Sequence, residues 1–539
     1  HPLELALLIA QYLSTSDKRA CVLVCKSWYA NYVQAIWSTL RLSRRRCFRI
    51  HYEDAFRAVL RKHIHHIRYL HWPIIRGIYD NNPFVLEILD IVAQECKNQL
   101  LGIEAVVDSQ EQMSACLALA DANPRLRTLN LHVVLFSHSN FVDFRPELPR
   151  LTRKLPQLEH LSLWCGEHPL AWVPQLLDCL PKLKSLALLR DRMRIWRFFK
   201  FVQPYPRPTL STSLPCFQSL QRLALNYVVF DEAFVMLVRR CPNLKELHIC
   251  NYRLVPGKAL IEQLQPSLSR LQSFTLRTWN VPPFSMLPLL QALPAQSLRE
   301  LNVSITDKPE LRFVSDHFSA TLVHLTIYLG EYIEHEDLNL IFVRCHNLKS
   351  LIVQTFHPVK AQLVIRGEQS GTPYTQPWVC TQLELLRIPL TLDRGGAFSD
   401  DKPGYIGGIP IQPNPSGLDV YKMGGEDMSV KTRKKKVPKV GDARKDWVKT
   451  ERLLMQRLGG LIRLRELDFS TECCFRGTRT NRTCLTWSLE NGLVYLAGLS
   501  KLERLHRGRG RFLQELPELR WMQQHWPNLH CRSRLHWIS

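Results

Sequence analysis

The feature that most constrains the fold is a short pattern that recurs along the chain, a leucine followed three and five places later by two more large apolar residues. The residue before this first leucine is never apolar, and a proline or cysteine often stands two or three places before it. From Leu220 to Leu348 successive copies start 24 to 27 residues apart. The clear copies start at Leu126, Leu158, Leu183, Leu220, Leu244, Leu271, Leu298, Leu322, Leu348, Leu383 and Leu464.

A period in this range is typical of leucine-rich repeats, whose units cannot bury their leucines alone and must stack on their neighbours. The alternating pattern predicts a short strand whose leucines face inward. In the clearest unit, a helix should precede the strand, because Asp231 can cap it and Phe234, Leu237 and Val238 share one face. Pro242 should then end that helix.

The sequence therefore predicts an α/β fold with a short N-terminal three-helix unit followed by a curved solenoid. A parallel sheet should line the concave face of the solenoid, and helices should lie outside. We expect a helical domain at 1–40, a repeat solenoid at 41–394, a flexible basic insertion at 395–449, and further repeats with a cap at 450–539. Degraded copies of the pattern extend the repeats toward both ends, near Ile67, Leu100 and Leu502.

The first forty residues carry three short stretches with apolar residues at helical spacing. The polar run from Ser14 to Asp17 can end the first helix and cap the second. Three short helices form a core that is marginal alone, so we expect a partner to complete it. The apolar residues are Leu5, Leu8, Ile9 and Leu13, then Val22, Cys25, Trp28 and Tyr29, then Val33, Ile36 and Trp37.

This segment resembles the F-box, most strongly in the run VCKSW at 24–28. In the repeats, CPNL at 241–244 and CHNL at 345–348 resemble the cysteine-containing leucine-rich repeats found behind F-boxes, and the irregular intervals resemble those of fungal members. The combined order resembles a substrate receptor of an SCF-type cullin–RING ubiquitin ligase. The residues that carry the F-box resemblance are Pro2, Glu4, Leu5, Asp17, Val24, Cys25, Lys26, Trp28 and Trp37.

The resemblance implies a non-catalytic subunit that docks on a Skp-type adaptor, and through it on a cullin, while the repeats hold a target protein. The implied adaptor-binding residues are Pro2, Leu3, Leu5, Ile9, Leu13, Val24, Cys25, Trp28 and Trp37. Strand residues two, four or six places after the first leucine of a repeat should face away from the core, where they either bind the target or form ordinary solvated surface. The target-binding candidates are Trp164, Asn226, Arg277, Tyr328 and Arg387.

The chain is strongly basic, with 71 Lys and Arg against 48 Asp and Glu, which favours an acidic target. We do not expect nucleic acid to be the partner, because no known nucleic-acid motif is present. Part of the charge falls between Leu383 and Leu464, an interval far longer than one repeat and rich in Gly, Pro, Asp and Lys. Its basic cluster is a candidate nuclear-localisation signal or a solvated charged loop: Lys431, Arg433, Lys434, Lys435, Lys436 and Lys439.

The sequence contains no catalytic or phosphate-binding motif of a common type, so we expect no enzyme activity, cofactor or metal. His63, His65, His66 and His71 alternate as on the exposed face of a strand. The 16 cysteines lack a short-spaced framework, which indicates reduced thiols in the cytoplasm or nucleus. No apolar run is long enough for a spanning helix, and the start, at His1, does not read as a signal peptide.

Two other functions remain open at this stage. The chain can be a leucine-rich-repeat scaffold whose N-terminal helices are a cap with no ligase role, or a basic protein associated with nucleic acid. Adaptor binding through residues 1–40 would distinguish the ligase substrate receptor from these two alternatives. Binding that weakens steeply with salt would favour the last.

Overall fold

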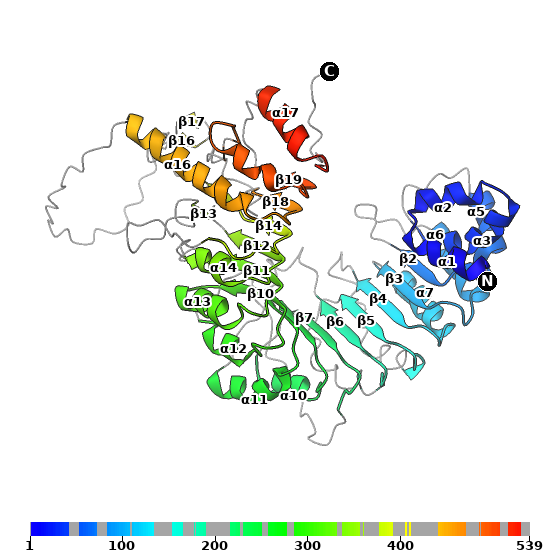
Figure 1. The fold of residues 1–539 in the computed structure, drawn as a ribbon. Helices are drawn as coiled ribbons and strands as arrows, with labels where there is room; N and C mark the ends of the chain where they lie inside the picture. The colour runs from blue at the N-terminus through cyan, green and yellow to red at the C-terminus, as the bar shows by residue number, and fades with distance from the viewer. Residues whose placement is uncertain are drawn as a thin grey trace. The chain divides into compact units, whose positions relative to one another are not determined.

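The computed structural model describes residues 2–42, 53–72, 83–107, 110–133, 153–164, 177, 179–189, 216–226, 230–250, 257–277, 285–330, 337–355, 359–360, 377–391, 405–406, 409–410, 440–469, 485, 487–506 and 516–529. The chain divides into two compact units, His1–Val303 and Ser304–Ser539. Both units carry strands interleaved with helices along the chain (Figure 1).

The first unit opens with helices and continues as a strand–helix array. Its helices are α1 Pro2–Tyr12, α2 Thr15–Val22, α3 Lys26–Trp37, α5 Glu53–His63, the 3-10 helix η2 Ile64–His66, α6 Pro83–Glu95, α7 Gln110–Asp121, α10 Glu232–Arg239, α11 Lys258–Leu268 and α12 Leu287–Ala292. Its strands are β1 Thr39–Arg41, β2 Tyr69–Trp72, β3 Gly102–Val107, β4 Thr128–Val133, β5 His160–Trp164, β6 Ser185–Leu189, β7 Arg222–Asn226, β8 Glu246–Cys250, β9 Ser273–Arg277 and β10 Glu300–Ile305.

Strands β1 to β10 pair in chain order, each parallel to the next. The register places equivalent repeat positions side by side, so that Leu186, Leu223 and Leu247 follow one another across three strands. All three are buried, and so is the first leucine of every clear copy of the pattern. The predicted inward-facing leucines and the parallel sheet of an α/β repeat solenoid are confirmed.

Helix α10 shows how one repeat closes its core. The Asp231 side chain accepts a hydrogen bond from the Phe234 backbone N–H at 3.0 Å, which satisfies a donor at the start of the helix. Phe234, Leu237 and Val238 are buried, as their spacing predicted. The helix ends at Arg239, three residues before Pro242.

The cysteine that precedes several repeats packs at the end of such a helix. Cys241 is fully buried, and its thiol donates to the Leu237 carbonyl at 3.3 Å. Cys345 and Cys380 are buried at the equivalent position of later repeats. Burial raises the pKa of each of these thiols to about 12, because the thiolate would lose its hydration. These cysteines therefore serve as small apolar residues.

The second unit continues with the same kind of repeat. Its helices are α13 Lys308–His317, α14 Leu338–Arg344, α16 Val440–Gly459, the 3-10 helix η7 Leu493–Gly498 and α17 Leu516–His525. The strands β11 His324–Leu329, β12 Ser350–Thr355, β14 Leu385–Arg387, β18 Glu466–Asp468 and β19 Arg504–His506 pair in parallel in that order. Two separate pairs are β13 Val359–Lys360 with β15 Leu390–Thr391, and β16 Tyr405–Ile406 with β17 Ile409–Pro410.

The expected insertion differs from the structure at its C-terminal boundary. Helix α16 begins at Val440, so the expected boundary between residues 449 and 450 falls inside a helix. The charged composition of residues 440–449 favours a loop, but the chain there is helical. The end of α16 is packed: Thr450, Glu451 and Leu454 are buried. Within 395–449, the structure otherwise describes the short hairpin β16–β17.

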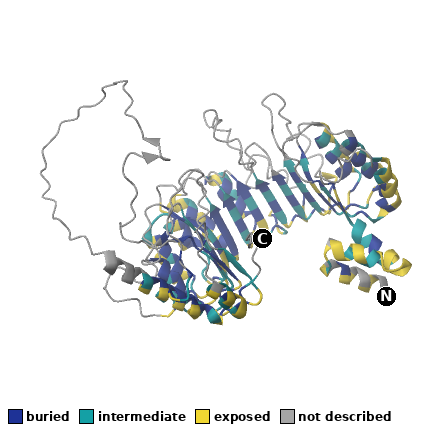
Figure 2. Ribbon diagram, turned by 90° about the horizontal axis from the view of Figure 1, so that it is seen from above, coloured by how far each residue is buried: buried dark blue, intermediate teal, exposed yellow. Residues whose placement is uncertain are grey.

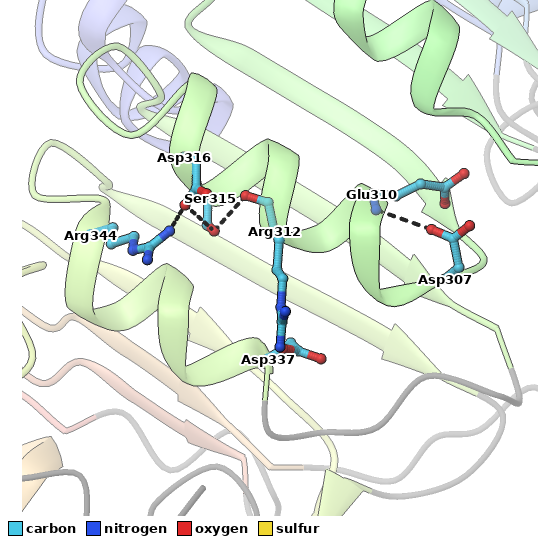
Figure 3. A network of polar contacts seen from close by, with 7 residues as sticks. All are labelled: Asp307, Glu310, Arg312, Ser315, Asp316, Asp337 and Arg344. Atoms are coloured by element: carbon cyan, nitrogen blue, oxygen red, sulfur yellow. Dashed lines mark hydrogen bonds and ion pairs between the residues drawn. The ribbon is translucent and has the colours of Figure 1, made fainter. Parts of the chain in front are cut away.

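Polar side chains connect successive helices α13 and α14 (Figure 3). Arg312 Nε lies 3.1 Å from Asp337 Oδ1, and Arg344 pairs with Asp316. At the start of α13, Asp307 accepts from the Glu310 N–H at 3.0 Å, while the buried Glu310 carboxylate accepts from the Thr306 N–H at 2.7 Å. These contacts fix each helix to the chain that precedes it and to the helix of the next repeat.

Candidate docking surface

The three N-terminal helices enclose a very small core. Ala10 of α1 and Tyr32 of α3 are its buried members, and Leu13, Cys21, Val22 and Ala35 pack against them. Between α1 and α2, Ser14 accepts from the Asp17 N–H while Asp17 accepts from the Ser14 N–H, both at 3.2 Å. The predicted cap of α2 is thus confirmed, as a reciprocal capping box.

Much of the apolar surface of these helices faces solvent (Figure 2). Tyr12 is 85% exposed, Leu23 84% and Val24 62%, which are large fractions for residues of this kind. Several large apolar side chains exposed on one short helical unit are typical of an interaction site. We call the set the helical apolar surface; its members are Leu5, Leu8, Ile9, Tyr12, Leu23, Val24, Trp28 and Tyr29.

The residues implied for adaptor binding divide into three groups. Leu5, Ile9, Val24, Cys25 and Trp28 are exposed. Leu13 packs against the small core, and Trp37 is half-buried at the end of α3. Pro2 and Leu3 lie on α1, but their side chains are outside the described part of the structure.

Sequence reasoning left Leu8, Tyr12, Leu23 and Tyr29 out of the candidate set, although all four are exposed. Helical spacing suggested a buried face for Leu8 and Tyr29, because a stripe of apolar residues normally faces a core. Three helices of 8 to 12 residues are too short to bury every such stripe. The available signal was the number of apolar residues in α1 and α3, which is larger than one buried face can hold.

A histidine joins the helical unit to the first repeat. His63, at the end of α5, is buried; its ring stacks on Trp37 of α3 at 5.0 Å, and its Nε2 lies 3.3 Å from the Tyr29 hydroxyl. The Ser38 carbonyl, after α3, accepts from the Arg68 and Tyr69 N–H groups, both at 2.9 Å. The helical unit is therefore attached to β2 by both side-chain and backbone contacts.

The histidine cluster was predicted to form the exposed face of a strand, and that prediction is wrong. His63 ends α5, Ile64–His66 is a 3-10 helix, and His71 lies on β2. The helix α5 continues through His63 because Leu60, His63 and Ile64 bury one side of it, and the chain becomes extended only at Tyr69. Burial, together with Lys62 and His65, lowers the pKa of His63.

The strands have a second face, which we call the open sheet face: the strand side chains that alternate with the buried leucines. Arg277 and Tyr328 are half-buried on it. Trp164 is the last residue of β5, and its side chain is outside the described part. Asn226 was expected to be exposed, but it is buried at the end of β7, where the alternation of buried and exposed residues breaks.

Several charges on the open sheet face are matched across neighbouring strands. His71 Nδ1 lies 2.8 Å from Glu104 Oε2, and Arg222 Nε lies 2.8 Å from Glu246 Oε1. Arg387, a target-binding candidate, is paired with two carboxylates of β18. The charges of Arg222 and Arg387 are therefore offset by carboxylates on the neighbouring strands.

The described residues show no group of three or more His, Cys, Asp or Glu side chains arranged to hold a metal ion. Among the helices that the structure describes, none has both the length and the apolar character needed to cross a bilayer. The nuclear-localisation candidates Lys431, Arg433, Lys434, Lys435, Lys436 and Lys439 lie outside the described residues.

No protein-family model matches the chain. F-box/LRR-repeat protein 8 of Homo sapiens is 24% identical over 367 residues, which cover 65% of this chain and 87% of the human protein. This weak similarity supports an F-box/LRR type of protein. Among solved structures, the crystal structure of the TLR13–ssRNA13 complex aligns with 93% of this chain at 17% identity and a TM-score of 0.30. This chain spans 58% of the length of that protein.

Proposed function

We propose that this protein is the non-catalytic substrate receptor of an SCF-type ubiquitin ligase. The helical apolar surface docks on a Skp-type adaptor and through it on a cullin, and the repeats hold a target protein in the cytoplasm or nucleus. The observation that carries the proposal is the exposure of eight large apolar side chains on helices whose own core is very small. The similarity to the human F-box/LRR-repeat protein supports the same assignment.

Leaving these apolar side chains in water is unfavourable, and a partner that covers them would remove that cost. Apolar surface buried against a partner contributes about 25 cal/mol per Å², so a few such residues can anchor a stable interface. Val24 and Leu23 follow α2, and Trp28 lies in the first turn of α3, so the three side chains come from one short stretch. A partner that covers them would also complete the small core.

A leucine-rich-repeat scaffold without a ligase role is the second candidate. It is favoured by the attachment of α3 to His63 and β2, since a cap of a repeat array needs such contacts too. The two candidates differ in what covers the helical apolar surface. A cap would leave it in solvent, whereas a receptor would bury it on the adaptor.

Binding of purified Skp-type adaptor to the full chain tests the proposal. Val24→Glu places a charge on the helical apolar surface without touching the core, so adaptor affinity should fall at least tenfold. Trp28→Ala should also weaken binding, although Trp28 contacts Tyr32 at 5.6 Å and its loss can loosen α3. Val59→Glu is the matched control, because Val59 is an exposed apolar residue of α5 outside this surface.

Two results would count against the receptor. Equal adaptor affinity for Val24→Glu, Val59→Glu and the unchanged chain would place the contact elsewhere. Failure of the unchanged chain to bind any Skp-type adaptor would favour the scaffold.

The nuclear part of the proposal has a separate test: removal of residues 430–439 should shift the protein from nucleus to cytoplasm, and an unchanged distribution would exclude that segment as the signal.

A further inference from the structure

We propose that Arg387 and Arg504 form a receptor for an acidic side chain, Asp or Glu, of the target polypeptide. The site lies on the open sheet face of the second unit. The inference rests on the proposed receptor function and deepens it, because it assigns the chemistry by which the repeats would recognise their target. The assignment comes from how three neighbouring strands place two arginines around two buried carboxylates.

The strand register brings these residues together. Strand β18 lies between β14 and β19, and Glu466 is level with Arg504, while Asp468 is level with Arg387. Arg387 Nη2 is 3.0 Å from Glu466 Oε1, and Arg504 Nη2 is 2.7 Å from Glu466 Oε2. Two guanidinium groups therefore approach one carboxylate from opposite sides. Arg387 Nε also lies 2.9 Å from Asp468 Oδ2, without hydrogen-bond geometry.

Exposure separates the roles of the four side chains. The Glu466 and Asp468 side chains are 5% and 8% exposed, whereas those of Arg387 and Arg504 are 42% and 43% exposed. The carboxylates thus lie beneath the arginines and are positioning residues. They hold two long, flexible side chains in one arrangement before any ligand arrives, which removes much of the entropy cost of binding.

The geometry suits a carboxylate ligand. A guanidinium carries five N–H donors in a planar fork, and the contacts to Glu466 and Asp468 involve Nη2 and Nε of Arg387 and Nη2 of Arg504. A carboxylate accepts two parallel N–H bonds from such a fork. The charges of Arg387 and Arg504 are already offset by the two buried acids, so the cluster has no net charge to balance a phosphate dianion, whose desolvation also costs more than that of a carboxylate monoanion. The site should therefore prefer Glu or Asp to a phosphorylated side chain.

Simple removal of an arginine would leave a buried carboxylate without its partner, which is strongly destabilising. Lysine avoids this problem, because it keeps the positive charge beside Glu466 but cannot form a planar fork. Arg387→Lys and Arg504→Lys are therefore the informative variants. Arg465→Lys is the matched control: Arg465 is also half-exposed beside an acid, 3.7 Å from Glu503.

The experiment measures binding of fluorescein-labelled peptide pools to the full chain by fluorescence anisotropy. Each pool has random flanks and one fixed central residue, Glu, Gln or phosphoserine. We expect the Glu pool to bind at least tenfold more tightly than the Gln pool and more tightly than the phosphoserine pool. Arg387→Lys and Arg504→Lys should each remove that preference, while Arg465→Lys should keep it.

The peptide-binding results test the acidic-residue site, and the adaptor-binding results test the ligase role. Equal binding of Glu and Gln pools, tighter binding of the phosphoserine pool, or a Glu preference that survives both lysine variants would overturn the assignment. Adaptor binding by the same variants reports separately on the proposed function. A chain that discriminates Glu from Gln but binds no adaptor would keep the acidic-residue site and lose the ligase role, and the reverse result would lose only the site.

Discussion

At the scale of single residues, burial decides the chemistry of the cysteines. Cys96, Cys116, Cys241, Cys345 and Cys380 are buried, and their pKa values are raised to about 12 because a thiolate would be desolvated. Among the cysteines that the structure describes, the exposed thiols are those of Cys25, which precedes α3, and Cys216. The same residue type therefore serves as a packing group in the repeats and as a reactive group at the surface.

Alkylation should reveal this division. Iodoacetamide at pH 8 should modify Cys25 and Cys216 of the folded protein at least tenfold faster than the five buried cysteines, since the thiolate is the reacting species. Urea should abolish the difference. Mass spectrometry of the labelled peptides measures both, and rapid labelling of Cys241 in the folded protein would contradict its burial.

His63 should make the attachment of α3 sensitive to acid. Its folded pKa is lowered from 6.5, so the unfolded chain binds the proton more readily. The contribution of the neutral ring to stability is therefore present above pH 6.5 and is lost as the pH falls below that value. Two basic neighbours, Lys62 and His65, add to the effect of burial on the pKa of His63, because a positive charge nearby disfavours protonation of the ring.

The measurement is hydrogen exchange of the α3 amides at pH 7.5 and pH 5.5, corrected for intrinsic rates. Exchange should be faster at pH 5.5. His63→Phe keeps an aromatic ring beside Trp37 but cannot be protonated, so it should reduce the pH dependence. His66 also has a lowered pKa, and a smaller dependence should therefore persist. An α3 that exchanges equally at both pH values would contradict this account.

At the scale of elements, close contacts depend on single glycines. Gly459 ends α16, and a Cβ atom there would clash with the Tyr495 carbonyl oxygen of η7. Both groups belong to the backbone, so neither can move without displacing its helix. Nearby, the buried Glu451 of α16 accepts from Asn491 Nδ2 at 3.1 Å, which ties α16 to the turn that precedes η7.

Gly459→Ala should therefore destabilise the second unit by about 2–3 kcal/mol, the usual cost of overpacking. Gly257→Ala is the control, because a Cβ at Gly257 would meet nothing within 4 Å. That change should cost no more than about 1 kcal/mol, because Gly257 is the N-cap of α11 and alanine is a poorer residue at that position. Urea unfolding measures both; equal midpoints would contradict the predicted clash.

Local sequence patterns predicted the elements well, because the fold of a repeat is determined mainly by residues that lie close together in the sequence. The inward leucines, the cap at Asp231 and the α2 cap at Ser14 follow from spacings of a few residues. The pairing of Arg387 with Glu466 could not be predicted in this way, because 79 residues separate them and their register depends on which strand follows β14. The exposure of Leu23 and the burial of Asn226 likewise depend on what packs nearby, which the sequence does not state.

At the scale of the whole molecule, each described strand relies on its neighbours in the sheet. Leu247→Ala, in the buried core of β8, should cost about 2–5 kcal/mol through the cavity it leaves. Because repeats interact mainly with adjacent repeats, the loss should spread unevenly. Hydrogen exchange should accelerate most in β7, β8 and β9 and least in β2 and β3. A uniform acceleration across all of the strands would indicate a single cooperative core instead.

The long separation between β14 and β18 has a consequence for how the chain assembles during synthesis. Successive strands from β7 to β12 start 24 to 27 residues apart, so each can dock soon after it leaves the ribosome. The step from β14 to β18 needs a loop about three times longer, which adds about 1 kcal/mol of closure entropy. The arrival of Glu466 and Asp468 beside Arg387 should therefore be a late event, and the growing chain would carry its finished N-terminal repeats before this cluster exists.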